Sequence, residues 1–86
     1  MPAISVVMSV RNGEETISRS IDSIIIQTFP DWEMIICNDG STDNTLSIIT
    51  DYAKRDSRIT CISNKTSLGL AFSLNRCIEL AKRNIL

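Results

Sequence analysis

The chain has 86 residues, 43% of them hydrophobic and 22% charged, a composition typical of one soluble globular domain. Lys and Arg together number 9 against 10 Asp and Glu, which disfavours a nucleic-acid-binding protein because that class normally carries a clear basic excess. The sequence contains no histidine. The chain alone therefore cannot form a Ser-His-Asp triad, a Cys-His pair or an imidazole metal site.

The cysteines and the N-terminus indicate the compartment. Cys37, Cys61 and Cys77 stand at wide, irregular spacings, so we expect reduced, buried thiols rather than a zinc site or a redox dithiol. The N-terminal residues lack the basic region of a signal peptide, and no apolar run approaches the roughly 18 residues of a membrane span. We expect a cytoplasmic chain, whose parent protein at most lies peripherally at the inner face of the membrane.

The first segment predicts a buried strand followed by a helix. Residues 4–10 form a β-branched, nearly continuous apolar run, which is typical of a strand covered on both faces. Asn12 and Glu15 have the spacing of a capping box. Isoleucines at helical spacing follow until Pro30 ends the helix. These are Ile17, Ile21, Ile24 and Ile25.

A second strand and helix come next. Residues 33–37 form a short apolar run that ends in a polar turn at 38–43, which reads Asn-Asp-Gly-Ser-Thr-Asp. The Ser, Thr and Asp of this turn are good helix-capping residues. The helix that they precede carries its apolar residues on one face between Leu46 and Ala53.

The third unit begins with an alternating strand at residues 58–63, which suits the edge of a sheet. Ser67 is placed to cap a helix whose apolar residues run from Leu70 to Ala81. Residues 84–86 read as the entry to a fourth strand, so we expect a fragment of a longer protein. Strands that alternate with helices predict a three-layer αβα architecture with a parallel sheet.

The turn after the second strand is the strongest candidate for a functional site, because ligands of open α/β sheets bind beyond the carboxyl ends of the strands. Asp39 directly follows a hydrophobic strand, where a carboxylate is costly unless something hydrogen-bonds it. Gly40 permits a positive φ, and Ser41 leads into a helix. An alternative remains open, in which Asp-Gly is only a turn and Asp39 only a cap.

Four other kinds of site are disfavoured by the sequence. A haloacid-dehalogenase-type phosphatase would need an aspartate where Cys37 stands, and a calcium loop would need a glycine where Asn44 stands. The glycine-rich fingerprints of dinucleotide-binding folds and of P-loops are absent from the sequence.

Four stretches together resemble the family 2 glycosyltransferases, which are inverting enzymes with the GT-A fold. They are residues 2–14, 20–29, 31–43 and 68–75. Gln-Thr-Phe before Trp-Glu, followed by Asn-Asp-Gly-Ser-Thr-Asp, is more specific than any one piece. The resemblance implies that residues 1–86 form one nucleotide-sugar-binding half domain. This half is Rossmann-like, with parallel strands in the order 3-2-1 and a fourth strand that is cut short.

The resemblance also implies a nucleotide-sugar donor, most often a uridine diphosphate (UDP) sugar. Asp39 matches an aspartate that accepts a hydrogen bond from the uracil imide, and this fits because a carboxylate only accepts. Ser9 matches a position that contacts the uridine, and Glu14 matches an acidic residue of the same pocket or a helix cap. The expected nucleotide-binding residues are Ser9, Arg11, Glu14, Asp39, Gly40 and Ser41.

One of these residues departs from the usual family pattern. Arg11 stands where the family usually has an aromatic residue stacked on the uracil, although a guanidinium plane also stacks on a base. Asn64 and Lys65 lie near the same rim, and we interpret them as part of a solvated loop.

For the parent protein, the resemblance implies a divalent cation, Mn²⁺ or Mg²⁺, held by an Asp-x-Asp motif that these residues do not include. Because the motif and the catalytic base are both missing, we expect no catalytic residue, no metal site and no sugar transfer within the 86 residues. The parent is expected to act in bacterial polysaccharide assembly on a glycan or lipid-linked acceptor. A non-catalytic α/β module for nucleotide binding or association is the alternative. Because residues 4–10 keep one unpaired edge, we also expect a homodimer through that edge of the sheet.

Overall fold

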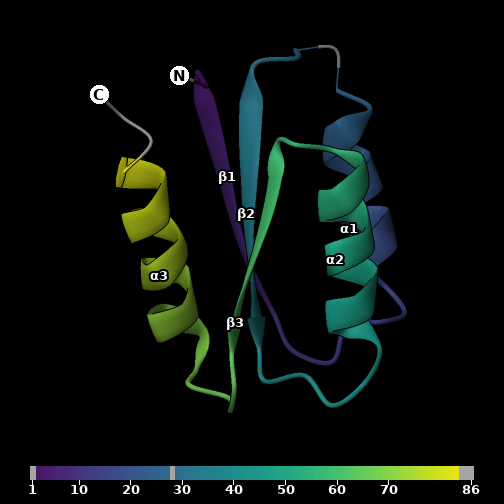
Figure 1. Ribbon diagram of the computed structural model, residues 1–86, viewed down its shortest axis with the longest axis vertical. Helices are drawn as coiled ribbons and strands as arrows, with labels where there is room; N and C mark the ends of the chain where they lie inside the picture. Colours follow the sequence, from purple (N-terminus) through teal and green to yellow (C-terminus); the bar gives the residue numbers. More distant parts are fainter. Residues whose placement is uncertain (1, 28, 84–86) are drawn as a thin grey trace.

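Six alternating strands and helices make up the computed structural model, which describes residues 2–27 and 29–83. The elements are β1 Ile4–Val10, α1 Ile17–Ile25, β2 Trp32–Asp39, α2 Thr45–Arg55, β3 Ile59–Asn64 and α3 Leu70–Arg83. Helices α1 and α2 cover one face of the sheet and α3 covers the other (Figure 1). The predicted three-layer αβα architecture is confirmed.

The three strands are parallel, with β2 between β1 and β3. This is the predicted order 3-2-1. Strand β2 pairs Cys37 with Ser9 of β1, and it pairs Asp39 with Asn64 of β3. The predicted fourth strand at residues 84–86 lies outside the described residues.

Strand β2 is the centre of the core because it is covered on both faces. Met34 and Ile36 pack into the cluster on the side of α1 and α2. Ile35 and Cys37 pack against Cys77 of α3. Successive side chains of a strand point to opposite faces, so the alternation places Asp39 on the same face as Cys37, toward α3.

The helix starts differ from the local capping rules. The capping-box prediction is wrong: α1 begins at Ile17, and its N-cap residue Thr16 makes no side-chain capping hydrogen bond. Asn12 instead adopts a φ of 52°, and its Oδ1 accepts the N–H of Thr42 at 2.8 Å. Ser67 does not cap α3 either, since its hydroxyl donates to the Asp39 carboxylate.

The three cysteines are free thiols, and burial raises the pKa of Cys61 and of Cys77. In the part of the chain that the structure describes, none of the helices has both the length and the apolar character needed to cross a bilayer.

Candidate functional site

A set of hydrogen bonds, here called the loop clasp, joins the β1–α1 loop to the β2–α2 loop at the carboxyl ends of the strands. The backbone N–H of Asn12 donates to Ser41 Oγ at 2.9 Å, and that of Gly13 donates to Thr45 Oγ1 at 2.9 Å. In return, Thr42 donates its N–H to Asn12 Oδ1. The two loops therefore hold each other with backbone donors and side-chain acceptors in both directions.

Two predicted nucleotide-binding residues, Glu14 and Ser41, belong to the loop clasp. Glu14 Oε2 accepts the N–H of Asn44 at 3.2 Å, just before α2 begins, so this carboxylate caps α2 rather than α1. Asp43 accepts the N–H of Glu14 and the hydroxyl of Thr45, and the Thr45 hydroxyl is the main cause that lowers the pKa of Asp43. In this structure Glu14 and Ser41 position the two loops.

Replacing Thr45 by valine should uncouple the loop clasp. Thr45 is fully buried, and its hydroxyl both accepts from Gly13 and donates to Asp43. Valine keeps the shape but leaves the Gly13 N–H without its acceptor, so we expect a loss of about 1–3 kcal/mol of unfolding free energy. Urea denaturation measures it. Thr50→Val on the same helix, where the hydroxyl only back-bonds to Ser47, is the matched control and should lose much less.

Asp39 lies in a second cluster, on the side of α3. Its Oδ1 accepts from Asn64 Nδ2 at 2.9 Å and from the N–H of Leu68 at 2.7 Å. Its Oδ2 accepts from Ser67 Oγ at 3.0 Å and from the N–H of Gly69 at 3.1 Å. A carboxylate offers about four acceptor positions, so all of them are engaged. These bonds hold the β3–α3 loop, residues 65–69, against the end of β2.

The hydrogen bonds of Asp39 also govern its charge state. The Leu68 N–H and then the Asn64 side chain hold the pKa of the Asp39 carboxyl well below its usual range, although burial acts in the opposite direction. Asp39 is therefore ionised at neutral pH and presents an acceptor without a donor.

Asn64 is a buried hydrogen-bond donor to Asp39. The interpretation of Asn64 as a solvated loop residue is therefore wrong. Asn64 is 5% exposed, and its Nδ2 donates to both Asp39 and the Ser73 hydroxyl. Its Oδ1 accepts from Arg76 Nη1 at 2.5 Å, and the same Arg76 nitrogen also donates to the carbonyl of Ser63. The polar network therefore runs from the end of β2 through β3 to α3. Lys65 is exposed, as expected.

Gly40 lets the β3–α3 loop approach the end of β2. Its φ is 66°, and a Cβ placed there would lie 2.5 Å from Ser67 N and 2.7 Å from the carbonyl carbon of Thr66. Only glycine tolerates both this conformation and this contact. The prediction of a positive φ at Gly40 is confirmed, and its role here is close packing of backbone against backbone.

The remaining predicted residues lie at the end of β1. Ser9 is half-buried and lies two residues after Val7, which packs on the side of α3, so Ser9 and Asp39 share one face of the sheet. Arg11 follows β1 and is exposed. The structure thus brings Ser9, Asp39 and Gly40 to the α3 side of the carboxyl edge, whereas Glu14 and Ser41 belong to the loop clasp.

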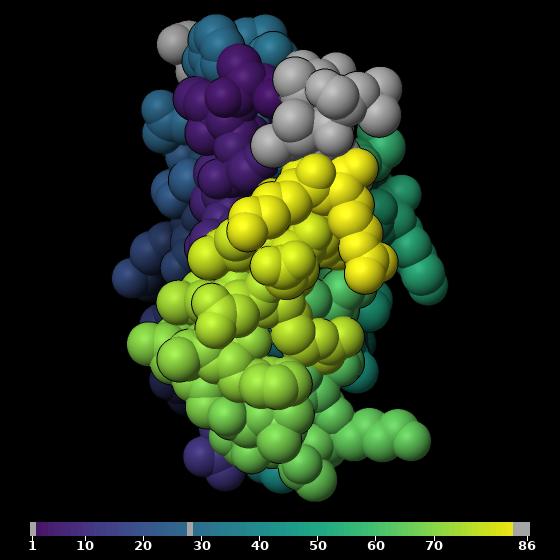
Figure 2. All heavy atoms as spheres, turned by 90° about the vertical axis from the view of Figure 1, so that its left-hand side faces the viewer, coloured from purple at the N-terminus to yellow at the C-terminus, as the bar shows by residue number. Residues whose placement is uncertain are grey.

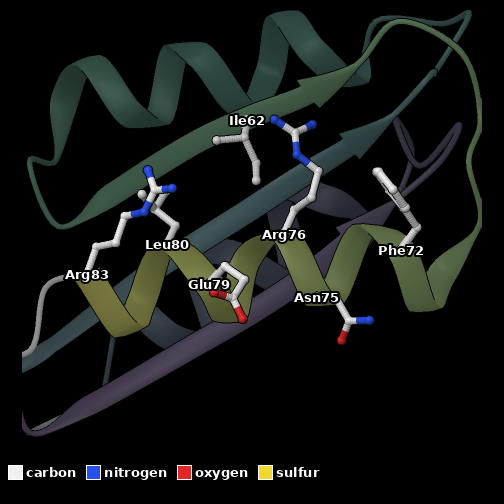
Figure 3. Close-up of a pocket in the computed structure, with 7 residues that line it drawn as sticks. All are labelled: Ile62, Phe72, Asn75, Arg76, Glu79, Leu80 and Arg83. Carbon is white, nitrogen blue, oxygen red and sulfur yellow. The ribbon is translucent and has the colours of Figure 1, made fainter.

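Two hollows on the described part of the surface do not include Asp39 among their lining residues. A groove of about 620 Å³ lies between β3 and α3, with Ile62, Leu80 and Arg76 among its lining residues, and it contains none of the predicted site residues (Figure 3). A hollow of about 350 Å³ beside the loop clasp includes Glu14 and Asp43. Within residues 2–27 and 29–83, no cluster of three or more Cys, Asp or Glu side chains is arranged to hold a metal ion.

A parallel sheet with helices on both faces and polar loops beyond its carboxyl ends is the architecture of nucleotide-binding α/β proteins. The sequence pattern of Glycosyl transferase family 2 matches residues 5–86. The chain belongs to this family, and its three strands and flanking helices are the Rossmann-like part of a GT-A fold.

Similar proteins agree with this assignment. EpsE of Bacillus subtilis (strain 168) is 48% identical over 81 residues, covering 93% of this chain and 29% of EpsE. The Escherichia coli UDP-Glc:alpha-D-GlcNAc-diphosphoundecaprenol beta-1,3-glucosyltransferase WfgD is 37% identical over 78 residues, covering 91% of this chain and 30% of WfgD. The solved mannosyltransferase PcManGT of Pyrobaculum calidifontis superposes with a TM-score of 0.83 at 24% identity, over 92% of this chain and 24% of that one. The chain thus spans about 30% of the length of these two relatives.

Proposed function

We propose that this chain is the donor-nucleotide-binding part of an enzyme that transfers a sugar, with inversion, from a UDP-sugar to a glycan or lipid-linked acceptor. The observation that carries the proposal is the ionised carboxylate of Asp39 at the carboxyl end of the central strand, on the same face as Ser9. An ionised carboxylate only accepts hydrogen bonds, and the uracil N3–H only donates. The name of WfgD, which specifies UDP-Glc, supports a uridine donor.

In the proposed complex, the residues of this chain bind and orient the nucleoside end of the donor. Asp39 accepts from the uracil imide, Ser9 contacts the uridine, and Arg11 stacks its guanidinium plane on the base. Gly40 keeps the β3–α3 loop close, and the loop clasp holds Glu14 and Ser41 at the rim. Binding energy spent on the nucleoside places the sugar for reaction.

A divalent cation, Mn²⁺ or Mg²⁺, is proposed for the parent enzyme, where it would neutralise the diphosphate leaving group. The PcManGT structure contains Mn²⁺ with GDP-mannose. The described residues of this chain do not fit such an ion, because they offer no cluster of metal ligands. Nucleotide binding by this chain is therefore proposed to be independent of metal.

Titration with UDP tests the proposal. We expect weak binding, with a Kd on the order of 1 mM, because only the nucleoside end is held. The amide signals of Ser9, Gly40 and Leu68 should shift in ¹H–¹⁵N NMR spectra, equally with Mn²⁺ or with a chelator. Cytidine diphosphate is the control, and it should bind more weakly because cytosine N3 carries no proton to donate to Asp39. The absence of any UDP-dependent shift would favour the alternative, a module for association only.

The proposed location of the parent is the cytoplasm, with peripheral contact at the inner face of the membrane. The support is the acceptor in the name of WfgD, a diphosphoundecaprenol-linked sugar, which is a lipid. No nucleic-acid partner is proposed, since the chain carries 9 basic against 10 acidic residues.

We also propose that two copies of this 86-residue chain associate through the outer edge of β1. Among the described residues no strand pairs with that edge, and β1 contains neither proline nor charge. Figure 2 views the molecule from the side of α3 and shows β1, in purple, beside that helix, with which it is in contact. Such an edge is a ready template for pairing with another chain.

A further inference from the structure

The four hydrogen bonds of Asp39 create a conflict with nucleotide binding. Its Oδ1 is held by Asn64 and Leu68, and its Oδ2 is held by Ser67 and Gly69. With every acceptor position of the carboxylate engaged, an imide N–H can bind only if one of these donors leaves. The identity of that donor then helps to set the affinity for the base.

Three of the four donors are fixed. Asn64 is buried and is tied at the same time to Ser73 and Arg76. The N–H groups of Leu68 and Gly69 belong to the backbone at the start of α3, where Gly69 O already accepts from Ser73 N. Moving either backbone group would shift the helix start together with the loop.

The Ser67 hydroxyl is the donor that can leave. It ends a single rotatable bond on an exposed residue, and its bond to Oδ2 is 3.0 Å long. The backbone of Thr66 and Ser67 packs tightly on Gly40, so the loop itself stays in place while the side chain turns. A change of χ1 frees one position on Oδ2 and leaves the hydroxyl in water.

We propose that Ser67 is an affinity-setting residue that occupies the base-binding position of Asp39 in the free chain and is exchanged for the uracil N3–H when the donor binds. This inference rests on the proposed function. The exchange replaces one hydrogen bond to the carboxylate with another, so part of the binding energy of the base is spent on releasing Ser67. Removing the hydroxyl removes this competitor.

Isothermal titration of the 86-residue chain with UDP tests the exchange. Ser67→Ala should bind UDP about ten times more tightly than wild type, or tighter still, which corresponds to the net contribution of one hydrogen bond to a charged group. Ser67→Thr keeps the hydroxyl and should bind as wild type does. Thr66→Ala removes a neighbouring hydroxyl of the same exposed loop that does not contact Asp39, and it is the matched control.

A modified ligand shows whether the gain comes from the imide. 3-Methyluridine diphosphate lacks the N3–H, so Ser67→Ala should bind this ligand with the same affinity as wild type. If wild type binds UDP and Ser67→Ala binds it equally well or more weakly, the exchange is overturned and the proposed function stands. An increase in affinity on Ser67→Ala that is equal for both ligands would also overturn the exchange. Failure of both wild type and Ser67→Ala to bind UDP would overturn the proposed function, and the exchange with it.

Discussion

Asp39→Ala should abolish measurable UDP binding and lower the melting temperature by at least about 8 °C. The carboxylate joins the end of β2 to the β3–α3 loop through four hydrogen bonds, and alanine leaves all four donors without it. The largest cost falls on the Asn64 side chain, because this group is buried and water does not easily replace its lost acceptor. Calorimetry of unfolding and titration with UDP measure the two effects on the same samples.

Asp51→Ala is the control for this variant. Asp51 lies on the exposed side of α2 and pairs only with Arg55 four residues on, so its removal should change the melting temperature by no more than about 3 °C. A chain that keeps its UDP affinity after Asp39→Ala would contradict the role of Asp39 in base binding. A melting temperature equal to that of the control would contradict its role as the anchor of the loop.

The Asp39 carboxylate should make the unfolding free energy depend on pH in the acid range. Because its hydrogen bonds lower the pKa of Asp39 in the folded chain, the stabilisation is fully present above the ordinary carboxyl value of about 3.9. It is lost as the pH falls from there through the lowered folded value. The pKa of Asp43 and of Asp56 is lowered as well, so wild type shares this loss among three groups. Asp39→Asn should flatten, but not remove, the decline in unfolding free energy that urea titrations measure below pH 4.

The isolated chain should self-associate through β1, with a dimer or larger species dominant at high micromolar concentration. Among the residues that the structure describes, no strand pairs with the outer edge of β1, which leaves a row of N–H and C=O groups open to pairing, and Ile4 at the start of the strand is 49% exposed. A second strand on this edge would satisfy the backbone groups and cover apolar side chains at once. Size exclusion coupled to light scattering measures the mass.

Ile4→Lys should shift the chain toward monomer, because a charge on an edge strand discourages pairing. Leu46→Lys introduces the same charge at another exposed apolar side chain, 39% exposed on α2, and should leave the mass unchanged. A wild-type chain that remains monomeric at high micromolar concentration would show that the edge is protected. An equal effect of both lysines would point to apolar contacts elsewhere on the surface.

The sequence by itself determined the order of the elements, the layers and the position of the central carboxylate. The apolar run of β1 and the helical spacing of Ile17 and Ile21 are local patterns, and hydrophobic burial acts on such patterns wherever the chain places them. The strand that ends at Asp39 is the most buried in the sheet. A carboxylate at the end of such a strand needs hydrogen-bond donors, which is why it could be recognised in advance.

Only the tertiary structure decided which donors and acceptors meet. Local capping rules assigned Asn12, Glu14 and Ser67 to the nearest helix, but their partners lie 28 to 30 positions away in the sequence. Asn64 looked like a solvated loop residue, and its bond to Asp39 spans 25 positions. Parallel pairing of the strands brings the loops at their carboxyl ends together, so a polar side chain there finds a donor on a neighbouring loop before it finds one on its own helix. No local pattern carries that information, because the register between strands sets it.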